Sequence, residues 1–358
     1  MRQVERLVGG LVVAVLLSAA CARSAPSAPS AAPAAASASQ SAAAPQDEPP
    51  VMWPQKITIA YSSISGSQMP IYLAADNALF AKYGLDAEVA YVASGTSTMQ
   101  SLVAGDMQFV QTGGTEVPSA ALGGAPVKML VGWINVVPSL FMVDPSITTP
   151  EQLRGKAIGI TKFGAQTHSG ARLALRKWGL NPDTDVQYLQ LGGVPEILAG
   201  MESGAVQGGV YTPPTNVRAR KLGFRVLGDL GQMGIPFQGT GLIGLQPYVD
   251  ANPEVVRRAA KALSEGIKLY LTDDEAARAA LAKYTKTDDP EQLDESIAYY
   301  RSVLQRIPYP SVEGIQTAID DVALQDPRAS ALRPADLIDT RALEQLEREG
   351  FFKQLWGD

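Results

Sequence analysis

The sequence predicts an α/β fold with two lobes, because one order of strands, turns and helix occurs twice along the chain. In the first copy, a strand over residues 87–92 reaches the turn Ser94-Gly95, a helix follows over 98–104, and a second strand covers 107–111. Gly105 ends the helix, as glycine often does just after a helix C-terminus. The unpaired backbone N–H groups of the first helical turn face the preceding loop, where glycine lets a ligand approach closely.

The second copy repeats this plan in the same order. A strand over residues 186–191 reaches Gly192-Gly193, a helix covers 194–203, Gly204 ends it, and a strand covers 206–211. Two such units predict two lobes that both present helix N-termini. Glycine-terminated helices occur in any α/β protein, so a chance match is the alternative. The shared order of the features favours the repeat.

Composition excludes several classes of site. With 358 residues, the chain is long enough for two domains with cores of their own. Its net charge of −6, without a basic run, argues against nucleic acid as a partner. The single cysteine, Cys21, rules out an intramolecular disulfide and a thiolate metal site, and the single histidine, His168, rules out a multi-histidine centre. We therefore expect neither a metal nor a cofactor.

Residues 1–21 have the pattern of a signal peptide, with a basic start and an apolar stretch over residues 7–17 that is too short to span a bilayer. The stretch ends in Leu-Ser-Ala-Ala-Cys, which resembles a bacterial lipobox, although Ser18 stands where an aliphatic residue is usual. Ordinary cleavage after Ala22 is the alternative. Because Cys21 lies at the end of the apolar stretch, we expect it to be lipidated and to anchor the protein to a membrane.

Residues 22–52 are almost entirely Ala, Ser and Pro, a composition that buries little and predicts a disordered linker. A tether of this kind suits a folded protein that follows a membrane anchor. We assign residues 53–137 and 240–358 to lobe 1 and residues 138–239 to lobe 2.

Local patterns place the remaining elements. Thr149-Pro150-Glu151-Gln152 has the residues of a capping box, and Asn252 and Asp289, each followed by proline and glutamate, predict helix starts. The chain beyond residue 252 is predicted to be helical, with its charged residues on solvated faces. Further strands are expected at residues 57–61, 127–133, 139–143, 157–161, 224–227 and 240–245.

Several runs of residues resemble the periplasmic substrate-binding proteins of nitrate/sulfonate/taurine-type ABC transporters. The wider superfamily includes binders of thiamine-pyrimidine precursors and the thiamine-pyrimidine synthases. The runs that carry the resemblance are MPIYLAADNALF at 69–80, YGLD at 83–86, VAGDMQF at 103–109, LRGK at 153–156 and YPSVEGI at 309–315.

The resemblance implies a two-lobed periplasmic binding protein fold, with mixed sheets flanked by helices and a helical C-terminal region. It also implies a small-molecule ligand enclosed between the lobes, delivery to the membrane subunits of an ABC permease, an extracytoplasmic location and no catalysis. We expect a monomer whose lobes close on the ligand about a hinge at residues 138–144 and 236–240.

Two other functions stay open at this point. The segment 239–244 matches G-x-G-x-x-G, but Pro247 follows where a helix is expected, so a close-packed crossing strand is the better interpretation. A thiamine-pyrimidine-synthase-like enzyme would use iron and a cysteine-rich motif, and the folded part of this chain has no cysteine. A ligand-binding sensor module for a membrane receptor would share both the fold and the site.

Six loops are expected to meet at the cleft, at residues 62–68, 94–97, 111–116, 163–168, 192–195 and 211–214. Their hydroxyls, amides and N–H groups suit a sulfonate-like anion at helix N-termini, whereas Phe163 and Tyr211 suit a planar heteroaromatic compound. Lys162 and Arg172 are expected either to attract an anion or to form surface pairs. The candidate ligand-binding residues are Ser63, Ser65, Ser67, Gln68, Gly95, Thr96, Gly113, Gly114, Thr115, Phe163, Gly164, Thr167, His168, Gly193, Tyr211 and Thr212.

Overall fold

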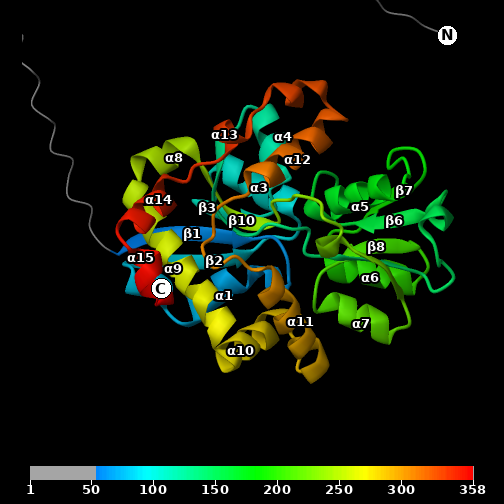
Figure 1. Cartoon of the computed structure of the whole chain (residues 1–358), viewed down its shortest axis with the longest axis horizontal. Helices are drawn as coiled ribbons and strands as arrows, with labels where there is room; N and C mark the ends of the chain where they lie inside the picture. The colour runs from blue at the N-terminus through cyan, green and yellow to red at the C-terminus, as the bar shows by residue number, and fades with distance from the viewer. Residues whose placement is uncertain (1–53, 358) are drawn as a thin grey trace, which may run out of the picture. The chain divides into compact units, whose positions relative to one another are not determined.

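The computed structural model describes residues 54–357, and their strands form two five-stranded sheets (Figure 1). Across the first sheet the order is β2 (Leu85–Tyr91), β1 (Gln55–Tyr61), β3 (Phe109–Thr112), β10 (Thr240–Leu245) and β4 (Val127–Ile134). Across the second sheet it is β7 (Gln187–Gln190), β6 (Ala157–Ile160), β8 (Gly208–Tyr211), β5 (Leu140–Val143) and β9 (Arg225–Asp229). The predicted signal peptide, linker and lipidated Cys21 lie outside the described residues.

The two sheets share one topology. In each, three strands run parallel, and a fourth strand that crosses from the other half of the chain pairs antiparallel beside them. The crossing strands are β10 in the first sheet and β5 in the second. This confirms the two-lobed, mixed α/β fold, and it gives the repeated sequence plan a structural basis.

Both faces of the first sheet are covered by helices because its strands bury side chains alternately on either side. Ile57 and Ile59 of β1 face one core, whereas Ala60 faces the other. The first core includes α1 (Met69–Asp76), α2 (Leu79–Lys82), α9 (Pro253–Thr272), α10 (Asp274–Thr285), α11 (Pro290–Val303), α14 (Arg341–Arg348) and α15 (Phe351–Trp356). The second core includes α3 (Gly95–Ala104), α4 (Glu116–Leu122), α12 (Val312–Ala323) and α13 (Pro334–Leu337).

The second sheet is also packed between helices. Phe141 and Val143 of β5 join the core beneath α5 (Gln166–Lys177), whereas Met142 faces α6 (Val194–Glu202) and α7 (Thr215–Lys221). Figure 1 shows these green elements grouped together around β6 and β8. The period-2 burial of β5 therefore fixes which helices cover which face.

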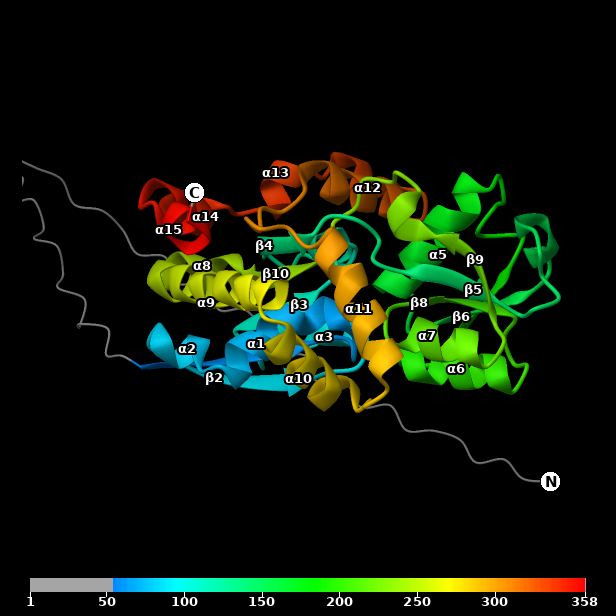
Figure 2. The same ribbon diagram turned by 60° about the horizontal axis from the view of Figure 1, so that its bottom comes forward.

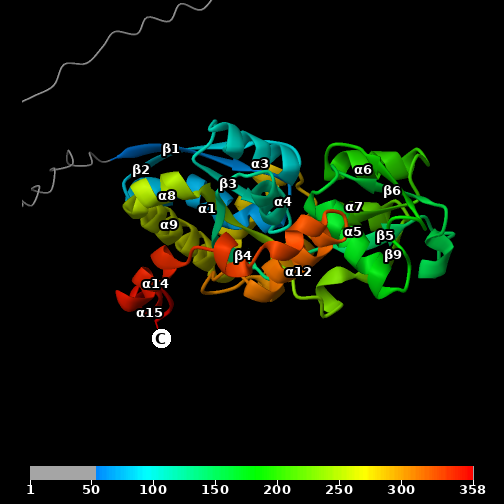
Figure 3. The ribbon, with the colours of Figure 1, turned by 90° about the horizontal axis from the view of Figure 1, so that it is seen from above.

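Local start signals hold in the C-terminal region. Asn252 is the N-cap of α9, and the Asp289 side chain accepts hydrogen bonds from the N–H groups of Glu291 and Gln292 at the start of α11. Figure 2 shows α11 running from the first-sheet half of the protein toward α7, and Figure 3 shows α12 beside α5. The capping box at Thr149 is also present, where it begins a 3-10 helix, η2 (Pro150–Leu153).

Two chain segments connect the sheets, between β4 and β5 and between η3 (Leu230–Gln232) and β10. They lie side by side where the Gly239 N–H donates to the Ile134 carbonyl at 2.7 Å. A Cβ at Gly241 would overlap the Val131 carbonyl oxygen, so the glycines of segment 239–244 serve close strand packing, as expected. The expectation that Pro247 prevents a helix after this segment is wrong. Helix α8 (Gln246–Ala251) follows directly and accommodates this proline in its first turn.

Element boundaries differ from the sequence-based ones by up to three residues at functionally relevant places. The helix predicted from residue 98 begins at Gly95, because Ser94 has φ of 74° and ψ of 135°, and this turn redirects the chain directly into the helix. None of the helices in residues 54–357 combines the length and the apolar character that a membrane span requires.

Candidate functional site

A cavity lies at the carboxyl ends of the parallel strands of both sheets, where such folds place their ligands. Its empty space is about 600 Å³, part of it open to solvent. The residues that line it come from the loops after β1, β2 and β3, from the loops after β6, β7 and β8, and from the beginnings of β5 and β10. They are Ser62, Ser63, Ile64, Ser67, Gln68, Tyr91, Ser94, Gly95, Thr112, Glu116, Ser139, Thr161, Ala165, Gln166, Thr167, Gly193, Val194, Thr212 and Thr240.

The loop after β1 is held by its own serines. The Ser65 side chain caps η1 (Gly66–Gln68) by accepting from the Ser67 N–H, and the two hydroxyls are 2.6 Å apart. Trp133 Nε1 donates to the Ser67 carbonyl at 3.0 Å from inside the core. Ser65 is therefore a structural residue, whereas Ser67 and Gln68 reach the cavity.

In the two turns that precede α3 and α6, the glycine that faces the cavity is not the residue with the left-handed backbone conformation. The positive φ values fall at Ser94 (74°) and Gly192 (97°), one residue before the glycines that face the cavity. Gly193 is extended, with φ of −138°. Gly95 and Gly193 are thus not required for an unusual backbone conformation, and their lack of a side chain matters for what packs against them.

Glu116 is the only charged residue among the lining residues that the structure describes, and its side chain is 3% exposed. Its Oε2 accepts a hydrogen bond from Thr115 Oγ1 at 2.9 Å. Burial raises the pKa of the Glu116 carboxyl to about 7, against the opposing effect of nearby donors such as Thr115 and the Gln166 N–H. Near neutral pH this carboxyl therefore exists in both protonation states.

Four buried polar side-chain atoms among the lining residues have no hydrogen-bond partner within the described part of the chain. They are Gln68 Oε1, Ser94 Oγ, Glu116 Oε1 and Thr212 Oγ1. Buried polar atoms are nearly always hydrogen-bonded in folded proteins. A cluster of unpaired polar atoms around one cavity therefore indicates a binding site for a polar ligand. Gln68 ends η1, Ser94 precedes α3, Glu116 is the first residue of α4, and Thr212 follows β8.

Contacts between the lobes close the rim of the cavity. Thr96 Oγ1 donates to the Phe163 carbonyl at 3.1 Å, and Lys162 Nζ donates to Ser97 Oγ at 3.3 Å. On another side, the Gly66 N–H donates to the Pro213 carbonyl at 3.3 Å.

Seven of the sixteen residues proposed from the sequence line the cavity, namely Ser63, Ser67, Gln68, Gly95, Thr167, Gly193 and Thr212. The other nine lie outside it, namely Ser65, Thr96, Gly113, Gly114, Thr115, Phe163, Gly164, His168 and Tyr211. The glycines at 113 and 114 serve packing, because a Cβ at Gly114 would lie 2.5 Å from the Gln238 Cβ and one at Gly113 would lie 3.1 Å from the Gly239 carbonyl oxygen.

None of the three candidate rings lines this cavity. His168 is buried between Phe163 and Tyr188, with ring centroids 5.1 and 4.8 Å away, and its Nδ1 accepts from the Gly164 N–H at 3.2 Å. Burial, followed by Arg172, lowers the pKa of His168 to about 4, so the ring is neutral at pH 7. Tyr211 is fully buried with its hydroxyl on Met201 Sδ, and Phe163 is 49% exposed, so the two do not form a sandwich.

Arg172, which was expected near an anion or at the surface, is buried and joins the lobes. Its Nε lies 3.2 Å from Oδ1 of Asp321 on α12, and that oxygen also accepts from Arg176 at 2.7 Å. Arg172 and Asp321 are 1% and 3% exposed, and a second carboxylate, Asp183, pairs with the other side of the guanidinium.

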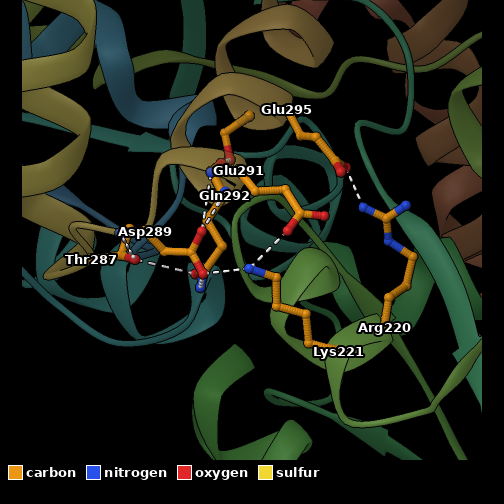
Figure 4. A network of polar contacts seen from close by, with 8 residues as sticks. Arg220, Lys221, Thr287, Asp289, Glu291, Gln292 and Glu295 are labelled. Carbon is orange, nitrogen blue, oxygen red and sulfur yellow. Dashed lines mark hydrogen bonds and ion pairs between the residues drawn. The ribbon is translucent and has the colours of Figure 1, made fainter.

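Exposed ion pairs link the lobes at α7 and α11 (Figure 4). Lys221 Nζ is 2.5 Å from Asp289 and 2.9 Å from Glu291, and Arg220 pairs with Glu295. These carboxylates are solvent-exposed, as the sequence predicted, but the sequence did not predict that they pair with basic residues of the other lobe.

Sequence reasoning named the loops but missed several side chains. Glu116 and Ser94 lie within loops expected at the cleft, whereas Tyr91, Thr161, Ser139 and Thr240 lie outside them. Ser139 and Thr240 sit at the starts of the two crossing strands. Because these strands are antiparallel to their neighbours, they begin at the edge where the parallel strands end, and this rule identifies both residues. No group of three His, Cys, Asp or Glu side chains in the described residues is placed to hold a metal ion.

Comparison with known families gives one match over more than half of the chain. Residues 66–277 match the family model described as NMT1/THI5 like. A taurine-binding periplasmic protein of Escherichia coli (strain K12) is 28% identical over 223 residues, which cover 61% of this chain and 67% of that protein.

Solved structures share the fold at low sequence identity. The alkanesulfonate-binding protein SsuA from Xanthomonas axonopodis pv. citri, bound to MOPS, has a TM-score of 0.67 at 19% identity, covering 81% of this chain and 100% of that one. The periplasmic nitrate-binding protein NrtA from Synechocystis PCC 6803 has a TM-score of 0.69 at 15% identity, covering 84% of this chain and 88% of that one.

Proposed function

Because the chain belongs to the NMT1/THI5 like family, we propose that it captures a small polar solute between its lobes and delivers it to an ABC permease. The observation that carries this proposal is the set of four buried polar atoms without partners around one cavity at the strand ends. The ligand contacts are assigned to the seven predicted residues that line the cavity, together with Ser94 and Glu116.

The anionic part of the ligand is proposed to lie against lobe 2. The first residues of α5 and α6 line the cavity there, and helix N-termini offer unpaired N–H groups and a favourable dipole. Thr212, whose buried hydroxyl has no partner among the described residues, lines the same cavity. Relatives named for taurine, alkanesulfonate and nitrate support an anion-bearing solute. A planar heteroaromatic ligand has less support, because Phe163 and Tyr211 lie outside the cavity.

We place the mature protein on the extracytoplasmic side, anchored through a lipid on Cys21. The sequence pattern of residues 1–21 and the relative named as periplasmic support this location. Membrane fractionation of the wild type and of Cys21→Ala tests it. The wild type is expected in the membrane fraction and the variant in the soluble fraction; equal solubility of both would replace the anchor with ordinary secretion.

A thermal-shift screen of small sulfonates, carboxylates, amino acids and inorganic anions tests the capture itself. A solute at a hundred times its Kd should add about 2.7 kcal/mol to the free energy of unfolding. Hits are then followed by uptake in cells with and without the protein. Failure of every solute class to stabilise the folded protein would overturn the proposal.

The same screen separates the alternatives. A hit recovered chemically unchanged after long incubation supports binding, whereas its conversion would favour a synthase-like enzyme. Unchanged uptake in cells that lack the protein, despite tight binding, would favour a sensor module.

A further inference from the structure

The Glu116 carboxyl group stands against the N-terminus of α3. A Cβ atom added to Gly95, the first residue of that helix, would lie 2.7 Å from Glu116 Cδ and would overlap Oε1. The backbone N–H groups and dipole at a helix N-terminus favour a negative charge there. The protein's own carboxyl group therefore lies at the N-terminus of α3.

Only one of the two carboxylate oxygens is satisfied. Oε2 accepts from Thr115 Oγ1 at 2.9 Å, whereas Oε1 is buried beside Gly95 and has no hydrogen-bond partner among the described residues. A buried acceptor without a donor is costly, and a charged one more so. A donor brought by the ligand removes this cost.

No side chain of the described lining residues supplies a positive charge. The lining residues include no lysine, arginine or histidine. The basic groups in the neighbouring segments are engaged elsewhere, since Lys162 donates to Ser97, Arg172 pairs with Asp321 and Asp183, and His168 is neutral. Helices α3 and α4 carry no other titratable side chain, and neither does β3. None of these basic groups forms a hydrogen bond or ion pair with Glu116 within the described residues, so we assign its counter-charge to the solute.

We propose that the solute is a small zwitterion, whose ammonium group binds Glu116 Oε1 while its sulfonate or carboxylate lies against α5 and α6 of lobe 2. This inference rests on the proposed function and adds the cationic half of the ligand. A bare anion would meet an uncompensated buried carboxylate, so Glu116 selects for amine-bearing solutes and against simple anions of the same size.

Isothermal titration calorimetry at pH 8 tests the proposal with matched probes. Taurine is compared with ethanesulfonate, and β-alanine with propionate, so that each pair differs in the ammonium group. The proteins are the wild type, Glu116→Gln, which keeps the size of the side chain without its charge, and Glu88→Gln, which removes one charge from an exposed position of β2.

The wild type and Glu88→Gln are expected to bind at least one ammonium-bearing probe at least tenfold more tightly than its partner. In Glu116→Gln this preference should fall by at least tenfold, with circular dichroism unchanged. Equal binding of the paired probes by the wild type, a preference that survives in Glu116→Gln, or no binding of either zwitterion would each overturn the inference. If the inference fails but the thermal-shift screen has found another ligand, the proposed solute-binding function is still supported. If the screen has found no ligand either, both the inference and the proposed function are contradicted.

Discussion

The Glu116 carboxyl group packs so closely against Gly95 that residue 95 has no room for a side chain. A Cβ on Gly95 would lie 2.7 Å from the Glu116 Cδ and would overlap Oε1. The carboxyl group is thus seated on the first residue of α3, and its other neighbour there is the Thr112 hydroxyl. Residue 95 is therefore glycine chiefly because any larger residue would clash with the Glu116 carboxyl group. Replacing it with valine would displace Glu116 as well as any ligand, so substitution of Glu116 itself gives a cleaner test.

Glu116→Gln should stabilise the ligand-free protein at alkaline pH. Burial raises the pKa of this carboxyl from an ordinary 4.5 to about 7, so the folded state holds a proton that the unfolded state has released between these values. The free energy of unfolding therefore falls as pH rises from 4.5 to 7 and stays low above 7. Glutamine avoids this cost, which is about 3 kcal/mol.

Urea unfolding of ligand-free wild type and Glu116→Gln at pH 5 and pH 8 measures this effect. The variant should gain most at pH 8 and little at pH 5. An equal difference at both values would mean that ionisation of Glu116 does not limit stability. A stabilised variant that binds no solute would also separate the role of this residue in binding from any role in folding.

Ser94→Gly should raise stability while weakening ligand binding. Ser94 holds φ of 74° with a side chain, and glycine takes such a conformation without steric cost, so we expect a gain of about 1 kcal/mol. The same change deletes the unpartnered Oγ at the cavity. Ala78→Gly is the matched control, since Ala78 has φ of 52° on the surface and lies outside the cavity.

Urea unfolding and calorimetry with the screened ligand read both effects. Both glycine variants should gain stability, and only Ser94→Gly should lose affinity. Unchanged affinity in Ser94→Gly would remove its hydroxyl from the proposed site.

The contrast between Ser94 and Tyr211 illustrates which features of the site could be predicted from the sequence. Repeated strand, turn and helix patterns are local, so they predicted the two lobes and placed most loops at the cleft correctly. The direction of a side chain depends on partners distant in sequence. Tyr211 follows the same pattern as the lining residues but turns toward Met201, and Arg172 is drawn into a pair with Asp321, 149 residues away. No periodicity reports such pairs.

Asp321→Asn should destabilise the protein strongly, because it leaves the Arg172 guanidinium buried with only the exposed Asp183 as a charged partner. Removing one member of a buried pair costs about 3–5 kcal/mol. Asp336→Asn is the control, since Asp336 pairs with Arg333 at the surface and exposed pairs contribute under about 1 kcal/mol.

Chemical denaturation of both variants measures the difference. The double variant Arg172→Met, Asp321→Leu should recover much of the loss, because matched apolar residues replace buried pairs well. A loss no larger than that of Asp336→Asn would show that the pair does not hold the lobes together.

Removal of Arg220 and Lys221 should weaken ligand binding without touching the cavity. Their pairs with Asp289, Glu291 and Glu295 link α7 to α11 across the lobes (Figure 4), so their loss favours lobe opening. Exposed pairs contribute under about 1 kcal/mol each, which predicts a two- to tenfold increase in Kd for the double alanine variant.

The wild type should lose affinity between low and high salt, and the double variant should be nearly insensitive, because salt screens exposed charges. Arg218→Ala is the control, as Arg218 pairs with Glu202 within the same lobe. Calorimetry at two salt concentrations decides the matter. An equal salt response in the double variant would assign lobe closure to other contacts.

The placement of β10 between β3 and β4 affects the order in which the two lobes fold during synthesis. The ribosome completes every strand of the second sheet before it makes β10, so lobe 2 can mature while the first sheet still has a gap at its centre. Domains commonly fold as units in the order of their synthesis. Here that order is reversed, and nascent chains stalled before β10 emerges should resist protease in the second lobe while the first, although older, is still digested.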